Sequence, residues 1–153
     1  MSILLECALM RRSYILTAAC LGLLALASTG TSQSPERFRV RLTTVPMDGG
    51  MRNTVAGFGS ASATLAGGTL SITGTFDGLK SPATTAKLNS GVAKGVRGNP
   101  VADLTVTKST KGSITGSVDL TAEQVKGLRD GRFYVEIASE KAPEGNLWGW
   151  ILK

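Results

Sequence analysis

One-by-one alternation of apolar and polar residues is the feature that most constrains how this chain folds. Phe38, Val40 and Leu42 alternate with two arginines and a threonine. A period of two sends successive side chains to opposite faces of an extended strand, so one face is apolar and the other meets solvent. The same alternation returns over residues 69–76 and 133–137. An amphipathic helix needs a period of about 3.6 residues, so these segments are predicted to be strands.

Turn signals divide the chain into short strands. Gly67 and Gly68 separate the segments 57–65 and 69–76, and two adjacent glycines supply the positive φ angles of a tight hairpin turn. Further strands are predicted over residues 38–45, 84–89, 102–107, 112–118, 133–137 and 147–152. About eight closely spaced strands predict an all-β fold, an antiparallel β-sandwich or barrel of immunoglobulin-like or superoxide-dismutase-like kind.

One short helix is predicted between the strands. Thr121 and Gln124 have the spacing of a capping box, in which each side chain bonds the other residue's backbone amide. Val125 and Leu128 give the following turns one apolar side, and Gly131 favours the end of the helix.

The first residues are typical of an export signal. Residues 14–27 are almost entirely apolar and follow Arg11 and Arg12. This run is shorter than the about 20 residues of a membrane-spanning helix, and it ends in small residues that signal peptidase recognises. We therefore predict cleavage between Ala27 and Ser28, and a secreted or periplasmic protein with no stable membrane span after signal removal.

Several details of this region stay open. Translation begins at Met1 or at Met10, and export uses either the general secretion route or the twin-arginine route. A retained anchor is the alternative to a cleaved signal peptide over residues 1–27. Residues 28–37 are mostly small and polar and are predicted to form a flexible leader, which leaves residues 38–153 for the β domain.

The absence of histidine excludes many kinds of site. No imidazole is present to act as a general base or to bind zinc, copper or haem. Both cysteines, Cys7 and Cys20, fall within the predicted signal peptide. No phosphate-binding loop and no nucleophile elbow occurs. The sequence therefore predicts no catalytic residue, no metal site and no cofactor.

A series of short motifs follows along the chain in order. These motifs cover residues 44–46, 57–61, 68–73, 86–91, 131–137 and 143–151. The series resembles the CHRD (chordin) domain family from about Phe38 to Lys153. The resemblance implies an extracytoplasmic β domain, known mainly from secreted bacterial proteins of undetermined function and from an animal growth-factor antagonist.

The chain departs from this family where the family carries histidines. A His-apolar-His element of the family corresponds here to Lys87 and Asn89. An Asn and a His in a later strand correspond to Glu136 and Ala138. The resemblance thus implies fold and compartment, and no histidine-dependent role carries over.

The last strand departs as well, because a Glu-apolar-Arg pattern is replaced by Asn146 and Trp148. Together with Lys87, Asn89 and Glu136, these side chains replace a polar cluster that the family spreads over three strands. They are therefore candidates for a ligand or partner site. The alternative is a Lys–Glu pair with neighbouring amides, worth about 0–1 kcal/mol if exposed.

Two further groups are candidates for a partner surface. Trp148 and Trp150 lie two residues apart and share one strand face, where they form a stacking platform or pack in the core. Arg37, Arg39 and Arg41 form a stripe on the solvent side of the first strand, which attracts an acidic partner or guards an edge strand. No nucleic-acid motif occurs, so nucleic acid is not expected as a partner.

The sequence favours an exported, non-enzymatic domain that serves as a protein-interaction or accessory module in the cell envelope. One alternative is a binder of an anionic glycan or envelope polymer, which would use the arginine stripe and the net positive charge, +6 for the full sequence. The other is a small subunit that stabilises a periplasmic enzyme through an exposed apolar patch.

Overall fold

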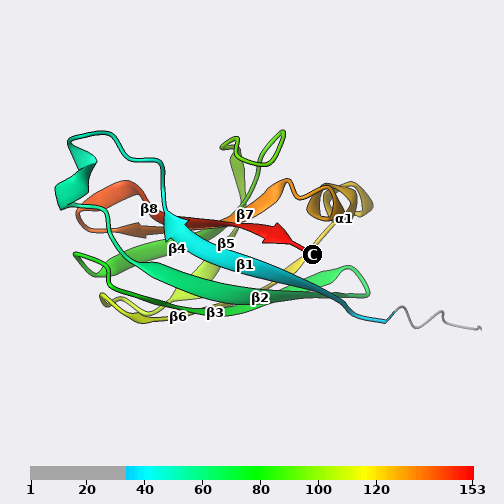
Figure 1. Cartoon of the computed structure of the whole chain (residues 1–153). Coiled ribbons are helices and arrows are strands. Elements are labelled where there is room, and N and C mark those ends of the chain that lie inside the picture. Colours follow the sequence, from blue (N-terminus) through cyan, green and yellow to red (C-terminus); the bar gives the residue numbers. More distant parts are fainter. Residues whose placement is uncertain (1–33) are drawn as a thin grey trace, which may run out of the picture. The chain divides into compact units, whose positions relative to one another are not determined.

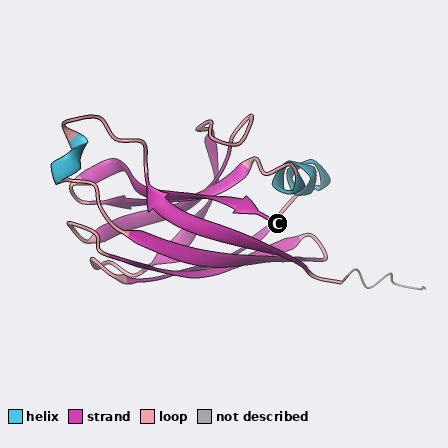
Figure 2. Cartoon of the chain, viewed as in Figure 1, coloured by secondary structure: helices cyan, strands magenta, loops and turns pink. Residues whose placement is uncertain are grey.

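Eight antiparallel strands form a closed barrel with one short helix (Figure 1, and Figure 2 by secondary structure). The computed structural model describes residues 34–153, so the predicted signal peptide, its cleavage site and most of the predicted leader lie outside the described residues. The elements are β1 (Glu36–Thr44), β2 (Phe58–Ala66), β3 (Thr69–Asp77), β4 (Ala83–Ser90), β5 (Asn99–Val106), β6 (Gly112–Asp119), α1 (Ala122–Arg129), β7 (Phe133–Ser139) and β8 (Ala142–Leu152). The all-β prediction is confirmed, and the architecture is the barrel.

The strands follow the order β1-β2-β3-β6-β5-β4-β7-β8 around the barrel, and β8 pairs again with β1. The first strand therefore has a neighbour on each side, β2 and β8. A closed barrel has no edge to protect. The interpretation of the arginine stripe as an edge guard is wrong for this reason.

The interior of the barrel is an apolar core. Phe38, Val40 and Leu42 of β1 are at most 2% exposed. All eight strands contribute buried apolar side chains to the same cluster, and Leu128 of α1 joins it at the end of the barrel that the helix covers (Figure 1). Because alternate residues of each strand point inward, the alternation in the sequence becomes one continuous core.

The local turn and cap predictions are confirmed. Gly67 and Gly68 join β2 to β3 with φ angles of 58° and 93°. At the start of α1, Thr121 Oγ1 accepts a hydrogen bond from the backbone amide of Gln124 at 3.3 Å. Gln124 Oε1 accepts one from the amide of Thr121 at 2.9 Å, which completes the capping box.

Four strands begin earlier than predicted: β4 by one residue, β1 by two, β5 by three and β8 by five. β1 begins at Glu36, because Glu36 and the residue after it pair with the end of β2, so the predicted leader is two residues too long. β8 begins at Ala142, five residues before the predicted start. Pro143 lies in this early part, where the pairing with β7 is irregular, and a proline is tolerated at such a position.

Candidate functional site

Three of the predicted site residues lie side by side on the outer face of the barrel. Lys87 of β4 is paired with Glu136 of β7, and Glu136 is paired with Trp148 of β8. Residues directly opposite each other project from the same face of a sheet. The three side chains therefore form one row across three strands.

Arg97 reaches this row from the loop between β4 and β5. Its Nη2 lies 3.7 Å from Oε2 of Glu136, and its Nη1 donates a hydrogen bond to the backbone oxygen of Glu144 at 2.8 Å. Its guanidinium carbon lies 5.8 Å from the ring centroid of Trp148. The sequence alone does not point to Arg97, because nothing in a loop sequence distinguishes one surface arginine from another.

A shallow hollow, called here the outer cleft, lies among these groups. Its volume is about 190 Å³. It is lined by Thr85, Lys87, Arg97, Glu136, Ala138, Pro143 and Glu144. Pockets that enclose small ligands have volumes of about 300–1,000 Å³, so the outer cleft suits a single side chain of a partner better than a whole small molecule.

The carboxylate of Glu136 is poorly solvated. Its side chain is 20% exposed, and its Oε2 is buried without a hydrogen-bond partner. Burial raises the pKa of Glu136 above its ordinary value, and the positive charges of Arg97 and Lys87 oppose that rise. A donor from a binding partner would reach this buried oxygen only if a neighbouring side chain such as Arg97 moved aside.

Three aromatic rings form a cluster on the same outer face, and none of them lines the outer cleft. The ring centroid of Tyr134 lies 4.6 Å from that of Trp150 and 6.0 Å from that of Trp148, and the two tryptophan rings lie 5.9 Å apart. Both tryptophans are partly exposed. Tyr134 is only 1% exposed, and its hydroxyl accepts a hydrogen bond from the amide of Gly98 at 3.1 Å. The tryptophans are thus neither core residues nor a fully open platform.

Two asparagines of the predicted site do not reach the outer cleft. Asn146 is 0% exposed. Its Oδ1 accepts a hydrogen bond from the amide of Ala56 at 3.2 Å, and its Nδ2 donates to the backbone oxygen of Ala56 at 2.9 Å. Asn89 is 6% exposed and lies at an irregularity in the pairing of β4 with β5. Asn146 therefore fastens the loop before β2 to β8, and neither amide is available to a partner.

The arginine stripe lies on the outer face of β1, the strand next to β8. Arg37, Arg39 and Arg41 are exposed and alternate with the buried side chains of the same strand. None of the three forms an ion pair with a residue in the range 34–153. The stripe is therefore available to a partner and separate from the outer cleft.

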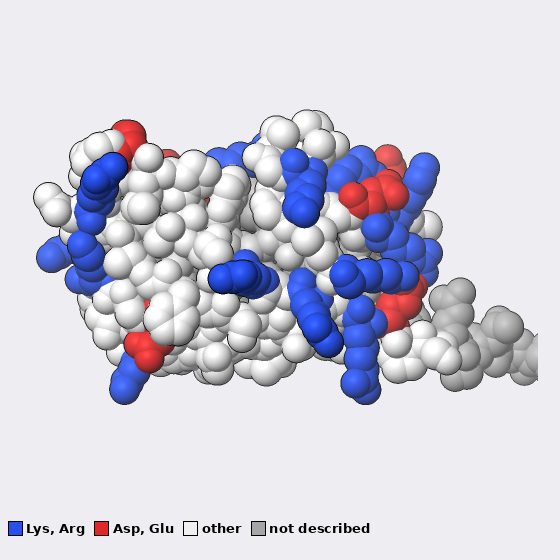
Figure 3. Space-filling model, in the orientation of Figure 1, with Lys and Arg blue, Asp and Glu red and all other residues white. Residues whose placement is uncertain are grey.

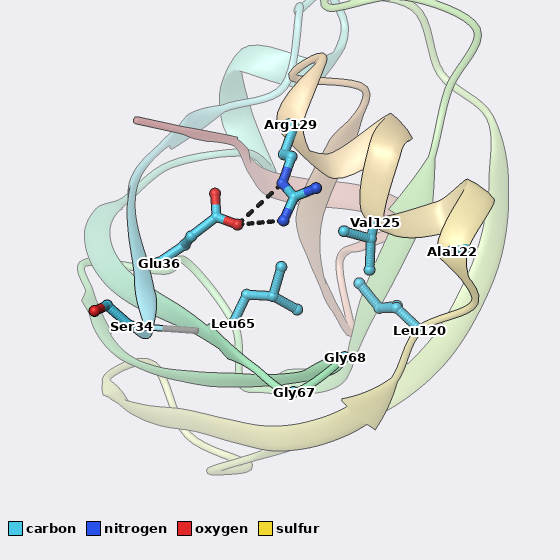
Figure 4. A pocket seen from close by; sticks show the side chains of 9 residues that line it. All are labelled: Ser34, Glu36, Leu65, Gly67, Gly68, Leu120, Ala122, Val125 and Arg129. Atoms are coloured by element: carbon cyan, nitrogen blue, oxygen red, sulfur yellow. Dashed lines mark hydrogen bonds and ion pairs between the residues drawn. The ribbon is translucent and has the colours of Figure 1, made fainter. Parts of the chain in front are cut away.

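A second hollow lies between α1 and the turn that joins β2 to β3 (Figure 4). Its volume is about 370 Å³. Across it, Arg129 donates two hydrogen bonds to Oε1 of Glu36, one of them from Nε at 3.0 Å, and Lys153 Nζ lies 2.8 Å from Oε2. These bonds lower the pKa of Glu36 to about 2, and the bond from Arg129 has the largest effect. Because its charged groups already satisfy one another, this hollow is a weaker candidate than the outer cleft.

In residues 34–153, no group of three His, Cys, Asp or Glu side chains lies close enough together to hold a metal ion. No helix in this range combines the length and the apolar character that crossing a membrane requires.

Comparison with known proteins gives the family. The family model of the CHRD domain matches residues 38–151, which is most of the chain and covers all eight strands except the first two residues of β1 and the last of β8. The chain belongs to the CHRD domain family. This CHRD domain places Lys87, Glu136 and Trp148 together on its outer face. No curated protein and no solved structure gave a significant match.

Proposed function

We propose that this CHRD domain is an exported, non-enzymatic module that binds a protein partner outside the cytosol, through the outer cleft and the tryptophans beside it. The observation that carries the proposal is the poorly solvated carboxylate of Glu136, which lies beside Arg97 and the partly exposed Trp148. An acceptor that lacks a hydrogen bond within the domain favours a partner that supplies one.

The residue types around the outer cleft support a protein partner. Arginine and tryptophan are enriched among the residues that contribute most to protein–protein binding. Here Arg97 is held over Trp148 by its bond to the backbone oxygen of Glu144, so part of its conformational entropy is lost before binding. A partner side chain with an amine or amide would take the place of Arg97 beside Glu136, because only 3.7 Å separates Arg97 Nη2 from Glu136 Oε2.

The composition of the chain supports a binding role over catalysis. The chain has no histidine, and its two cysteines precede residue 28. Lysine, arginine and carboxylate groups remain around the outer cleft, and these groups suit ion pairing and hydrogen bonding. The apolar segment 14–27 with its preceding arginines supports export.

Export and binding can be tested on one preparation. The full chain is expressed with its own leader in a bacterium, and the exported form is analysed by intact mass. We expect a mass that begins at Ser28. The purified exported form is then cross-linked to proteins of the envelope extract, and the captured partner is identified and its affinity measured for the wild type and for Lys87→Glu.

Lys94→Glu is the matched control, because Lys94 is also exposed and lies in the loop that carries Arg97 without lining the outer cleft. We expect Lys87→Glu to weaken partner binding by roughly tenfold and Lys94→Glu by less than about twofold. Equal affinities for the two variants would contradict binding at the outer cleft. An exported form that retains residues 1–27 would contradict cleavage of the signal peptide.

A further inference from the structure

Three straight rows of polar side chains cross the outer face of β1, β2, β3 and β6. The backbone register gives the rows as Arg41–Ser60–Thr75–Ser113, Arg39–Ser62–Thr73–Thr115 and Arg37–Thr64–Ser71–Ser117. Each row therefore begins with an arginine and continues with hydroxyls on three neighbouring strands. Neighbouring strands lie about 4.8 Å apart, and alternate residues of one strand about 6.7 Å apart, so the hydroxyls form a regular grid. We call the nine serines and threonines the hydroxyl face.

The hydroxyl face is open to a ligand. Eight of its nine residues are exposed, and Thr64 is partly exposed. Within the described residues, only Ser113 of this set bonds another side chain, the hydroxyl of Thr107 at 3.3 Å. The other hydroxyls are free to donate and accept hydrogen bonds.

The arginines of the rows carry a charge that the domain does not use. Opposite charges placed across strands stabilise a sheet, and here the cross-strand neighbours of Arg37, Arg39 and Arg41 on β2 are Thr64, Ser62 and Ser60. Since β1 is not an edge strand, protection against stray pairing does not explain them either. Three like charges at alternate positions repel one another, and a bound polyanion would remove that repulsion.

A hollow coincides with the same residues. It has a volume of about 590 Å³. Its lining includes Arg37, Arg39, Ser62, Thr64 and Lys153. Figure 3 shows Lys and Arg side chains in a line along the course that β1 takes in Figure 1, beside a largely uncharged surface over β2. Basic groups, hydroxyls and a depression are thus found together.

From this juxtaposition we infer that the arginine stripe and the hydroxyl face together bind an anionic polysaccharide. The carboxylate, sulfate or phosphate groups of such a chain pair with Arg37, Arg39 and Arg41. Its sugar hydroxyls exchange hydrogen bonds with the grid of serine and threonine hydroxyls. This function is additional to the proposed function and depends on it only in placing the domain outside the cytosol, where such polymers occur.

The composition of the rows favours a polysaccharide over the other polyanions. Docking on an anionic membrane uses apolar side chains beside the basic ones, and the three rows contain none. Single-stranded nucleic acid is held by stacking on aromatic side chains, and the rows contain no aromatic residue. Hydroxyls that face a polyhydroxylated chain offer many weak and similar hydrogen bonds.

The test measures binding of the exported form to dextran sulfate and polygalacturonate at low salt, with neutral dextran as the uncharged probe. The main variant replaces Arg37, Arg39 and Arg41 by Gln. We expect its affinity for both charged polymers to fall at least about tenfold, with a weaker dependence of affinity on salt. Binding to neutral dextran as strong as to the charged polymers would overturn the inference.

The matched control replaces Lys94, Lys126 and Lys141 by Gln, because these lysines are exposed, lie away from the rows and change the net charge by the same amount. We expect a loss of less than about threefold for this control. Equal losses of affinity in the two triple variants would show that net charge alone drives binding. That result would contradict a specific site at the arginine stripe.

A second variant, Ser62→Ala with Thr73→Val and Thr115→Val, removes one row of hydroxyls and keeps every charge. We expect roughly threefold to tenfold weaker binding to polygalacturonate with an unchanged salt dependence. Tighter binding to duplex DNA or to phosphatidylglycerol vesicles than to either polysaccharide, with no effect of this variant, would overturn the polysaccharide assignment.

The outer cleft variant separates this inference from the proposed function. Lys87→Glu is expected to retain polysaccharide binding, because Lys87 lies on β4, outside the three rows. Loss of polysaccharide binding in that variant would contradict the separation of the two sites. Capture of a protein partner without any polysaccharide binding would leave the proposed function standing and would refute the polysaccharide inference alone.

Discussion

Glu136 shows how a single carboxylate at an outward position carries a local energetic cost. Its carboxylate lies on the outer face of β7, yet the loop that carries Arg97 and the neighbouring strand β8 leave only 20% of its side chain exposed. Desolvation disfavours the ionised form and outweighs the attraction of the two nearby cations, so the pKa of Glu136 is raised.

This raised pKa has a consequence for stability that Glu136→Gln tests. A carboxyl whose pKa is higher in the folded than in the unfolded chain stabilises the fold below its ordinary pKa of 4.5, and that contribution is lost as the pH rises through the folded pKa. The free energy of unfolding of the wild type is expected to fall between pH 4.5 and neutrality as Glu136 ionises. We expect it to fall less in Glu136→Gln. Chemical denaturation at a series of pH values measures it.

Glu140→Gln is the control for this series, because Glu140 is exposed. Its pH dependence is expected to match that of the wild type. A Glu136→Gln protein that loses as much stability as the wild type between pH 4.5 and neutrality would contradict the account of Glu136.

Among the elements, β3 shows how the close pairing of two strands depends on a small residue. Leu70, Ile72 and Phe76 point into the core, and Gly74 occupies the inward position between the last two. A Cβ atom at Gly74 would overlap the side chain of Ala61 and lie 2.6 Å from the backbone oxygen of Ser60. The two strands approach each other this closely only because position 74 has no side chain.

We expect Gly74→Ala to destabilise the domain by roughly 1–3 kcal/mol, because the backbone of β2 must shift to admit a methyl group. Gly49→Ala is the control, since a Cβ atom at Gly49 would meet nothing within 4 Å. Urea denaturation of the two variants measures the difference. Equal midpoints for Gly74→Ala and Gly49→Ala would contradict the close approach of β2 and β3.

At the scale of the whole molecule, Glu36 connects the beginning of the barrel to its end. It lies at the first position of β1 and bonds both Arg129 of α1 and Lys153 at the last position of the chain. The helix and the pairing of β1 with β8 are therefore joined at one carboxylate. Its pKa of about 2 reflects these bonds, with that from Arg129 the larger.

Lowering the pH from 4.5 to about 2 is expected to weaken the bonds of Glu36 with Arg129 and Lys153. A carboxyl whose pKa is lowered by folding stabilises the fold above its unfolded pKa of 4.5, and the contribution is lost as the pH falls toward about 2. We expect Glu36→Gln to be less stable than the wild type at neutral pH, with a difference that narrows between pH 4.5 and pH 2. Thermal unfolding at these pH values measures it, and a constant difference would contradict the role of Glu36.

Much of the local structure was predictable because its causes are local. The alternation at Phe38, Val40 and Leu42, the glycine pair at 67–68 and the capping box at Thr121 each depend on residues within a few positions of one another. The candidate site was predictable only in part. Lys87, Glu136 and Trp148 lie together as the family resemblance suggested, whereas Asn146 turned out to be buried and Arg97 was not foreseen.

By itself, the sequence determined that this chain forms short amphipathic strands with one capped helix, and that no histidine chemistry is open to it. Only the tertiary structure decided that β1 closes on β8, and hence that the arginine stripe is not an edge guard. It also decided which hydroxyls align with those arginines. The physical reason is the distance along the sequence over which each interaction acts. A periodic pattern reports which way a side chain points. Strand pairing between residues as far apart as Arg39 and Leu152 depends instead on how the inward faces of all eight strands fill one core.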